Sequence, residues 1–202
     1  DCRRQRQMCI RDRGKGVMIG KLDNIEPRVV TVIGAGVAGT QSISKALDNN
    51  AFVKVLDTKK SKLQKLESKF GSNNIEYILS TSDSVQSAIN ESDMVIGSVY
   101  VVGKEAPKVV FKDMLKSMSP GTVMVDVSID QGGCFETSRP TTHDNPTFVE
   151  NDIVHYCVTN MPGAVPLTAT QALNKVTLKY IEDLANKGCL LYTSPSPRDK
   201  SS

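Results

Sequence analysis

The 202-residue chain has no tryptophan, only two histidines, and few aromatic residues, which make up 5% of it. No apolar run approaches the roughly 18 residues that a membrane-spanning helix needs, and no secretory signal is recognisable at the start. The apolar fraction of 39% is typical of a globular protein. We therefore expect a cytoplasmic protein with no membrane partner.

Cysteine is also scarce away from the chain ends. Of the five cysteines, Cys2, Cys9 and Cys189 lie in or beside the chain ends, which leaves Cys134 and Cys157. This pair has neither the spacing of a metal site nor that of a disulfide framework. We expect reduced thiols, as in a cytoplasm, and no metal site.

The overall charge of +3 comes from the ends of the chain. Residues 1–13 contribute +3 and residues 189–202 contribute +1, so residues 14–188 carry a net charge of −1. This part gives no electrostatic reason to expect a nucleic-acid partner. Both end segments lack a periodic pattern, and the second is rich in Ser and Pro. We interpret 1–13 and 189–202 as non-native tails and 14–188 as one domain.

Apolar runs alternate with helical patterns through this domain. Strands are expected at about 29–33, 51–57, 75–80, 93–99 and 122–129, with helices between them and another at 112–118. Such alternation predicts βαβ units with right-handed crossovers. The expected fold is a Rossmann-type, doubly wound α/β domain with a mainly parallel sheet and helices on both faces. Residues 166–187 are expected to form a pair of helices whose apolar positions pack on the sheet.

The glycine-rich turn after the first strand carries the clearest functional signal. Gly34 allows the sharp turn, Gly36 lets a pyrophosphate approach, and Gly39 lets the helix pack closely on the strand. The helix N-terminus then faces an anion. Asp57 ends the second strand, where an acid binds the ribose hydroxyls of a dinucleotide and disfavours a 2′-phosphate, so NAD is favoured over NADP. Another α/β protein, such as a methyltransferase with an adenosyl cofactor, stays an alternative at this point.

Ligands of such sheets lie beyond the carboxyl ends of the strands. The segments that follow the expected strands are therefore candidates, and several are polar or glycine-rich: 80–82, 97–100, 128–133 and 159–163.

Four stretches carry a family resemblance: VTVIGAGVAGTQ, DMVIGSVYVVGKEAPKVV, VMVDVSIDQGGCFETSRPTTHDNPTF and VHYCVTNMPGAVPLTATQALNKVTLKYIEDLANKG. Together they resemble the NAD-binding domain of alanine dehydrogenase over about residues 14–188. The resemblance implies reversible oxidative deamination of L-alanine to pyruvate and ammonium, with hydride transfer to NAD. It also implies an amino acid as the small-molecule substrate, and a homohexamer for the full-length protein.

The resemblance also implies residue roles. Asp130 takes the catalytic role at the substrate end, and Val37 lies beside the pyrophosphate turn. Asp57 binds the adenosine ribose, flanked by Thr58, Lys62 and Ser80. The nicotinamide side is lined by Val99, Val127, Val158, Asn160 and Met161.

The family's substrate domain has no counterpart in this chain. By resemblance, that domain supplies a lysine and an arginine for the substrate and a histidine acid/base. His143, in a loop, and His155, in an expected strand, do not replace them. We therefore expect a fragment that binds NAD and is catalytically incomplete.

Three alternatives remain. The nearest is the NAD-binding part of proton-translocating nicotinamide nucleotide transhydrogenase, against which Asp130 and the Cys134-Phe135-Glu136 continuation favour alanine dehydrogenase. A non-catalytic NAD-binding module would have no use for Asp130, Asn160 and Met161. Related lysine-forming dehydrogenases stay possible because the substrate domain chooses the amino acid.

Overall fold

The computed structural model describes residues 13–21, 23–101 and 103–187. These residues fall into two units that divide between Thr159 and Asn160. The segments 1–12 and 189–202, which the sequence marks as non-native, lie outside the described residues, so that interpretation stays a prediction.

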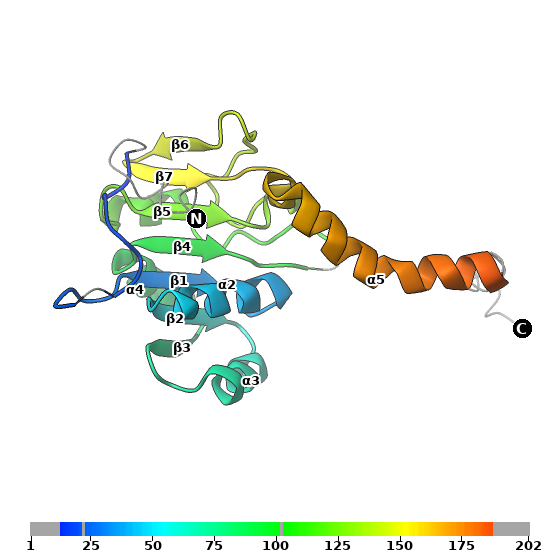
Figure 1. The fold of residues 1–202 in the computed structure, drawn as a ribbon. Helices are drawn as coiled ribbons and strands as arrows, with labels where there is room; N and C mark the ends of the chain where they lie inside the picture. Colours follow the sequence, from blue (N-terminus) through cyan, green and yellow to red (C-terminus); the bar gives the residue numbers. More distant parts are fainter. Residues whose placement is uncertain (1–12, 22, 102, 188–202) are drawn as a thin grey trace, which may run out of the picture. The chain divides into compact units, whose positions relative to one another are not determined.

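The first unit is built on one seven-stranded sheet. The strands are β1 (Val29–Ile33), β2 (Phe52–Asp57), β3 (Ile75–Leu79), β4 (Met94–Gly97), β5 (Val123–Asp126), β6 (Thr147–Glu150) and β7 (Ile153–Tyr156). Their order is β3-β2-β1-β4-β5-β7-β6 (Figure 1). All neighbours are parallel except β6 and β7. The predicted fold class is confirmed.

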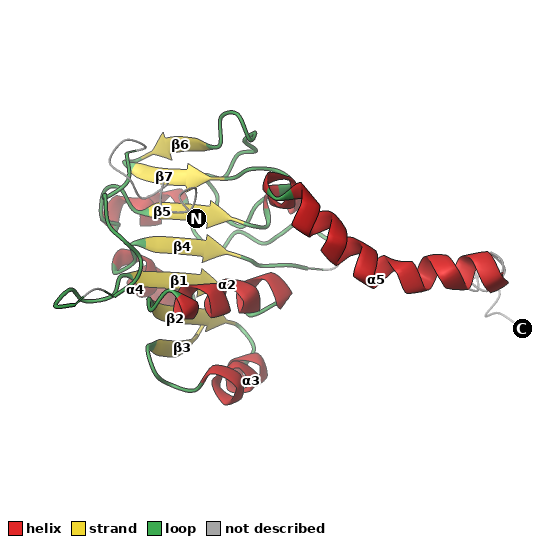
Figure 2. Ribbon diagram, viewed as in Figure 1, coloured by secondary structure: helices red, strands yellow, loops and turns green. Residues whose placement is uncertain are grey.

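Helices cover both faces of this sheet (Figure 2). On one face α2 (Val37–Asp48) and α3 (Lys60–Phe70) bury apolar side chains against the strands, and on the other α4 (Ser82–Asn90) and a 3₁₀ turn, η2 (Lys112–Ser117), do the same. The first core contains Ile43, Ala46, Leu63 and Leu66, and the second contains Val85, Ala88, Ile89 and Leu115. Fully burying a Val, Leu or Ile side chain contributes roughly 1.5–3 kcal/mol.

The strand order determines which edge of the sheet has a crevice. The chain moves outward from β1 through β2 to β3, then returns to β4 on the other side of β1. In a doubly wound sheet this reversal opens a crevice beyond the carboxyl ends of the two central strands. The glycine turn after β1 and the segment after β4 therefore share one edge of the sheet.

The outer part of the sheet differs from the sequence-based prediction. β6 is an antiparallel strand that was not anticipated, and it joins β7 through Asn151 and Asp152. Both residues have positive φ, 50° and 59°, the conformation of a two-residue type I′ hairpin turn, in which Asn and Asp are favoured. The helix expected at 112–118 is present as a 3₁₀ turn over residues 112–117.

The second unit contains a 3₁₀ turn, η4 (Met161–Ala164), and one helix, α5 (Pro166–Lys187). The predicted pair of helices is wrong, because no Gly or Pro interrupts residues 167–187. The apolar side chains expected to pack are 42–67% exposed: Leu173, Val176, Leu178, Ile181 and Leu184. Among the described residues, no helix is long and apolar enough to span a membrane.

Candidate functional site

Two of the three motif glycines are required by the protein's own packing. Gly34 has φ +103°, and its N–H donates to Leu56 O at 2.8 Å. A Cβ at Gly34 would lie 2.6 Å from Ser98 O, and one at Gly39 would lie 1.9 Å from Gly34 O. Gly39 therefore lets α2 pack on the turn, as the sequence motif predicts.

Gly36 is different, because a Cβ built there meets nothing within 4 Å. It is the N-cap of α2, and no side chain caps the helix. The unpaired N–H groups at this N-terminus, with the positive end of the helix dipole, form a ready anion site. No contact within the described protein requires glycine here, so the open space fits a ligand that approaches the backbone closely.

Asp57 binds the glycine turn from the end of β2. Its Oδ2 accepts from Ala35 N at 2.9 Å and from Lys62 Nζ at 3.3 Å, and its Oδ1 accepts from Lys59 N at 2.8 Å. The residue is 7% exposed. A carboxylate has about four acceptor positions, so three contacts leave it able to accept from a bound hydroxyl.

A cavity of about 890 Å³ runs along this edge of the sheet. Ligand cavities are commonly about 300–1,000 Å³. Ten of the predicted site residues line it: Gly34, Gly36, Val37, Asp57, Thr58, Lys62, Ser80, Val99, Val127 and Asp130. The structure thus brings the glycine turn, the acid after β2 and the turn after β5 to one cavity.

Asp130 lies in the turn that follows β5. It is exposed and belongs to a short 3₁₀ turn, η3 (Ile129–Gln131). The neighbouring Gln131 also lines the cavity, and its Oε1 is buried without a hydrogen-bond partner among the described residues. Val99 and Val127 give this end of the cavity an apolar surface beside the Asp130 carboxylate.

Four predicted site residues lie elsewhere. Gly39 packs beneath the turn, as described above. Val158 does not line the cavity, because its side chain is fully buried where residue 158 pairs with Thr141 in a parallel bridge. Asn160 and Met161 belong to the second unit, so their role at the nicotinamide end stays a prediction. Asn160 has φ 53°, a left-handed conformation that Asn tolerates, and its carbonyl accepts from Gly163 N.

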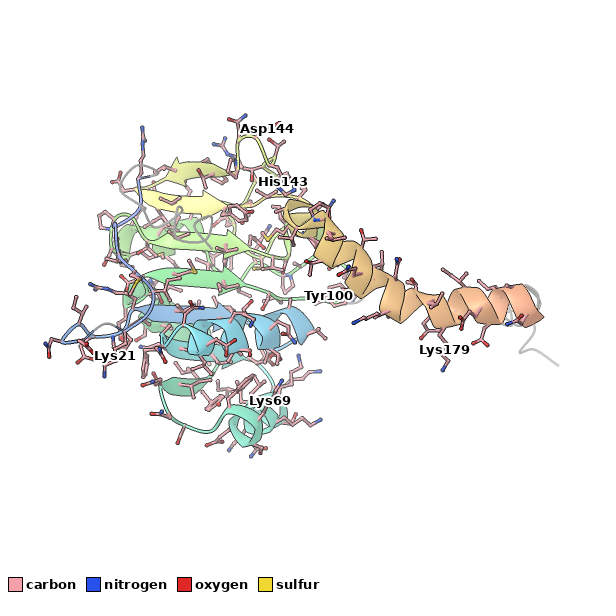
Figure 3. The ribbon with its side chains drawn as sticks, in the orientation of Figure 1. Lys21, Lys69, Tyr100, His143, Asp144 and Lys179 are labelled. Carbon is pink, nitrogen blue, oxygen red and sulfur yellow. The ribbon has the colours of Figure 1, made fainter. Side chains whose placement is uncertain are left out.

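The two histidines are not placed for proton transfer at the cavity. His155 is fully buried in β7, stacks on Phe148 at 4.8 Å, and is hydrogen-bonded to Thr137 Oγ1 at 2.8 Å and to Ile153 O at 3.1 Å. Burial lowers its pKa below the usual 6.5. His143 lies in the loop before β6 (Figure 3), and neither histidine lines the cavity.

The two described cysteines are poor nucleophiles. Burial, reinforced by the Asp126 charge, raises the pKa of the Cys134 thiol far above its usual range, and burial raises that of Cys157 to about 11. Both are free thiols in this structure.

The sequence indicates residues 97–100 as a candidate segment but not the cavity residues that follow it. Val101, Pro107 and Val109 line it from a segment without regular structure. Tyr100 lies beyond the carboxyl end of β4 (Figure 3), where it is 63% exposed. Ser98 fixes the glycine turn, because its Oγ donates to Ile33 O at 3.1 Å and to Gly34 O at 2.9 Å. The position of these residues just after β4 is the signal that identifies this segment.

The family model described as "Alanine dehydrogenase/PNT, C-terminal domain" matches residues 7–196. The chain belongs to this family. Alanine dehydrogenases of Halomonas elongata and Mycolicibacterium smegmatis are 48% and 47% identical to it over 175 residues, or 87% of the chain. The match covers 47% of each relative, so the chain spans about half their length.

One solved structure supports this assignment, and a second shows the same fold. An L-alanine dehydrogenase matches with a TM-score of 0.87 and 43% identity, over 91% of this chain and 51% of that one. A transhydrogenase from Sinorhizobium meliloti matches with a TM-score of 0.74 and 22% identity, over 89% of this chain and 53% of that one. The second likeness shows the fold alone. The predicted resemblance to alanine dehydrogenase is confirmed, and it is favoured over the transhydrogenase alternative.

Proposed function

We propose that this chain is the NAD-binding domain of an L-alanine dehydrogenase. Such an enzyme reversibly converts L-alanine, NAD and water to pyruvate, ammonium, NADH and a proton. The observation that carries the proposal is that Gly36, the uncapped N-terminus of α2 and Asp57 meet at one cavity. The 43–48% identity to alanine dehydrogenases supports the choice of reaction.

In this proposal the adenosine half is held by the β2 end of the cavity. Asp57 accepts hydrogen bonds from the ribose hydroxyls. Lys62 Nζ makes the longest of the three hydrogen bonds to the Asp57 carboxylate. Its side chain is 43% exposed, so it can move aside when the ribose binds. Thr58 and Ser80 line the same end.

The open space beside Gly36 would admit the pyrophosphate. The N–H groups of the first turn of α2 would donate to it, and the helix dipole would favour its negative charge. Val37, which is 86% exposed at this point, borders the same space.

Val99 and Val127, next to Asp130, would hold the nicotinamide. When bound, NAD supplies the hydride acceptor for the Cα–H of the amino acid. The exposed Asp130 carboxylate stabilises the cationic iminium form of the substrate and orients the nicotinamide ribose. By resemblance, the lysine, arginine and histidine that handle the substrate belong to a domain that is not in this chain.

An NADH fluorescence titration tests the site. We expect the wild-type chain to bind NADH and Asp57→Ala to weaken binding by about 10–100-fold, because charge-assisted hydrogen bonds to the ribose contribute roughly 1.5–3 kcal/mol each. Asp48→Ala, an exposed acid of α2 paired with Lys45, is the matched control. Unchanged affinity in Asp57→Ala would remove Asp57 from its proposed role.

A turnover assay tests whether the chain is catalytically complete. With L-alanine and NAD, we expect little or no NADH from this polypeptide alone. Robust NADH production would refute the proposal that the chain is a catalytically incomplete fragment.

We also propose that the full-length protein is a cytoplasmic homo-oligomer. The free, buried thiols of Cys134 and Cys157 are compatible with a reducing compartment. Light scattering of the full-length protein measures its assembly, and a monomer there would contradict the proposal.

A further inference from the structure

The turn that carries Asp130 is held from inside the protein by one buried carboxylate. Asp126, the last residue of β5, is 0% exposed. Its Oδ1 accepts from Ser128 N at 3.0 Å, and its Oδ2 accepts from Cys134 N at 2.8 Å. Further donors to Oδ2 are Phe135 N at 3.3 Å and Ser138 Oγ at 2.6 Å.

Burying a carboxylate is costly unless donors surround it. Here the donors come from both ends of the turn, so one side chain closes residues 128 to 134 into a loop of fixed shape. Ser128 Oγ extends this connection by donating to Val99 O at 2.7 Å. The Asp126 carboxylate therefore determines the positions of both apolar walls at this end of the cavity.

The same turn is held from outside by a lysine. Lys108 Nζ donates to Gly132 O at 2.6 Å and to Gly133 O at 2.7 Å. Both glycines have positive φ, 86° and 73°, and their two carbonyl groups converge on one ammonium. Lys108 is exposed, so its removal leaves the core intact.

Two backbone hydrogen bonds flank the Lys108 contact. Ala106 N donates to Gln131 O at 2.9 Å and Val109 N donates to Cys134 O at 2.8 Å. Lys108 thus completes a short ribbon that joins the segment after β4 to the turn after β5. Between Asp126 and Lys108, Asp130 is left as the exposed carboxylate that faces the cavity.

We propose that Asp126 and Lys108 are positioning residues for the nicotinamide end of the site, acting through the 127–134 turn on Val127 and Asp130. This inference rests on the proposed function, because it assigns that end of the cavity to the nicotinamide. Its specific consequence is that the two residues govern affinity for NADH and leave affinity for ADP, which occupies only the adenosine half, unchanged.

Calorimetric titration of the 202-residue chain with NADH and with ADP tests this. Lys108 contacts the turn and not the ligand, so its two charge-assisted hydrogen bonds act on binding only indirectly. We expect Lys108→Met to lose about tenfold in NADH affinity, because NADH must then order the turn on binding, while ADP affinity stays within about twofold. Lys108→Arg, which can donate to both carbonyls, should restore NADH binding. Lys104→Met, an exposed lysine of the same segment, is the matched control and should bind both ligands like the wild type.

Asp126→Asn should show a larger loss of NADH affinity than Lys108→Met, with ADP binding kept wherever the variant folds. Because the buried Asp126 tolerates substitution poorly, Lys108→Met is the variant that decides whether the positioning role holds. Hydrogen exchange adds a readout without ligand: amides of 128–134 should exchange at least about tenfold faster in Lys108→Met, and those of 29–57 should not change.

The outcomes separate the two proposals. A wild-type chain that binds neither ADP nor NADH overturns the proposed function and this inference with it. A wild type that binds both, with a Lys108→Met variant that binds NADH equally well or loses ADP and NADH together, overturns the positioning role alone.

Discussion

Gly36 and Gly39 belong to one motif, yet the structure predicts opposite effects for the same substitution. At Gly36, with φ −80° and ψ −166°, an alanine adopts the backbone without strain and its Cβ meets nothing. Reduced freedom of the unfolded chain stabilises the variant by about 0.4–1 kcal/mol, and the poorer N-cap costs about 0.5 kcal/mol. The two terms nearly cancel, so Gly36→Ala should melt within about 2 °C of the wild type.

Gly39→Ala should be strongly destabilised. Its Cβ would lie 1.9 Å from Gly34 O and 2.7 Å from Ser98 Oγ, and the first of these is backbone that cannot rotate away. Overpacking of this kind costs about 3 kcal/mol. For a chain of this size that lowers the melting temperature by about 6–12 °C.

For NADH binding by the folded protein, Gly36→Ala should be the more damaging of the two substitutions. The methyl group of Gly36→Ala occupies the space proposed for the pyrophosphate and separates it from the α2 amides. Loss of two charge-assisted hydrogen bonds corresponds to about a hundredfold or greater loss of NADH affinity. Thermal melts and NADH titrations of both variants check this. A Gly36→Ala chain that binds NADH normally, or that melts as low as Gly39→Ala, would refute the reasoning.

Two further predictions concern charge. The folded-state pKa of His155 is lowered, so the unfolded chain binds the proton more readily than the folded chain does. The neutral His155 therefore contributes fully to stability above the usual pKa of 6.5. This contribution is lost as the pH falls below that value. Denaturant melts at about pH 7.5 and about pH 5.5 should therefore show a smaller loss of stability in His155→Gln than in the wild type or in His143→Gln; equal losses would count against this. Asp57→Ser should shift the ratio of NADPH to NADH affinity upward by more than about tenfold, because it removes the repulsion of a 2′-phosphate and leaves Lys62 beside it. A ratio that stays constant in fluorescence titrations would show that Asp57 does not set the preference.

The sequence was most informative where backbone geometry demands particular residues. The apolar strands, the motif glycines and Asp57 follow rules of local conformation and close packing, and for that reason the parallel sheet and the meeting of the glycine turn with Asp57 at one cavity were predictable. The type I′ turn at Asn151-Asp152 has a recognisable local signal that the strand alternation obscured.

The features that the sequence did not predict depend on contacts between distant segments. No spacing rule links Lys108 to the carbonyl groups 24 and 25 residues further on. Likewise, Val101, Pro107 and Val109 come from a segment without a repeating pattern, and only the strand order brings it to the cavity. The burial of Val158 also follows from its bridge to Thr141 rather than from anything local.

The hairpin at the sheet edge determines where the chain emerges. Gly121 N, just before β5, donates to Asp152 O at 2.7 Å, which places the Asn151-Asp152 turn at the edge where the parallel strands begin. β7 then runs back parallel to β5, so the first unit ends at the edge that holds the glycine turn and Asp130. The chain reverses twice here, once on entering β6 and once at the Asn151-Asp152 turn, and β7 therefore runs toward the edge that holds the cavity.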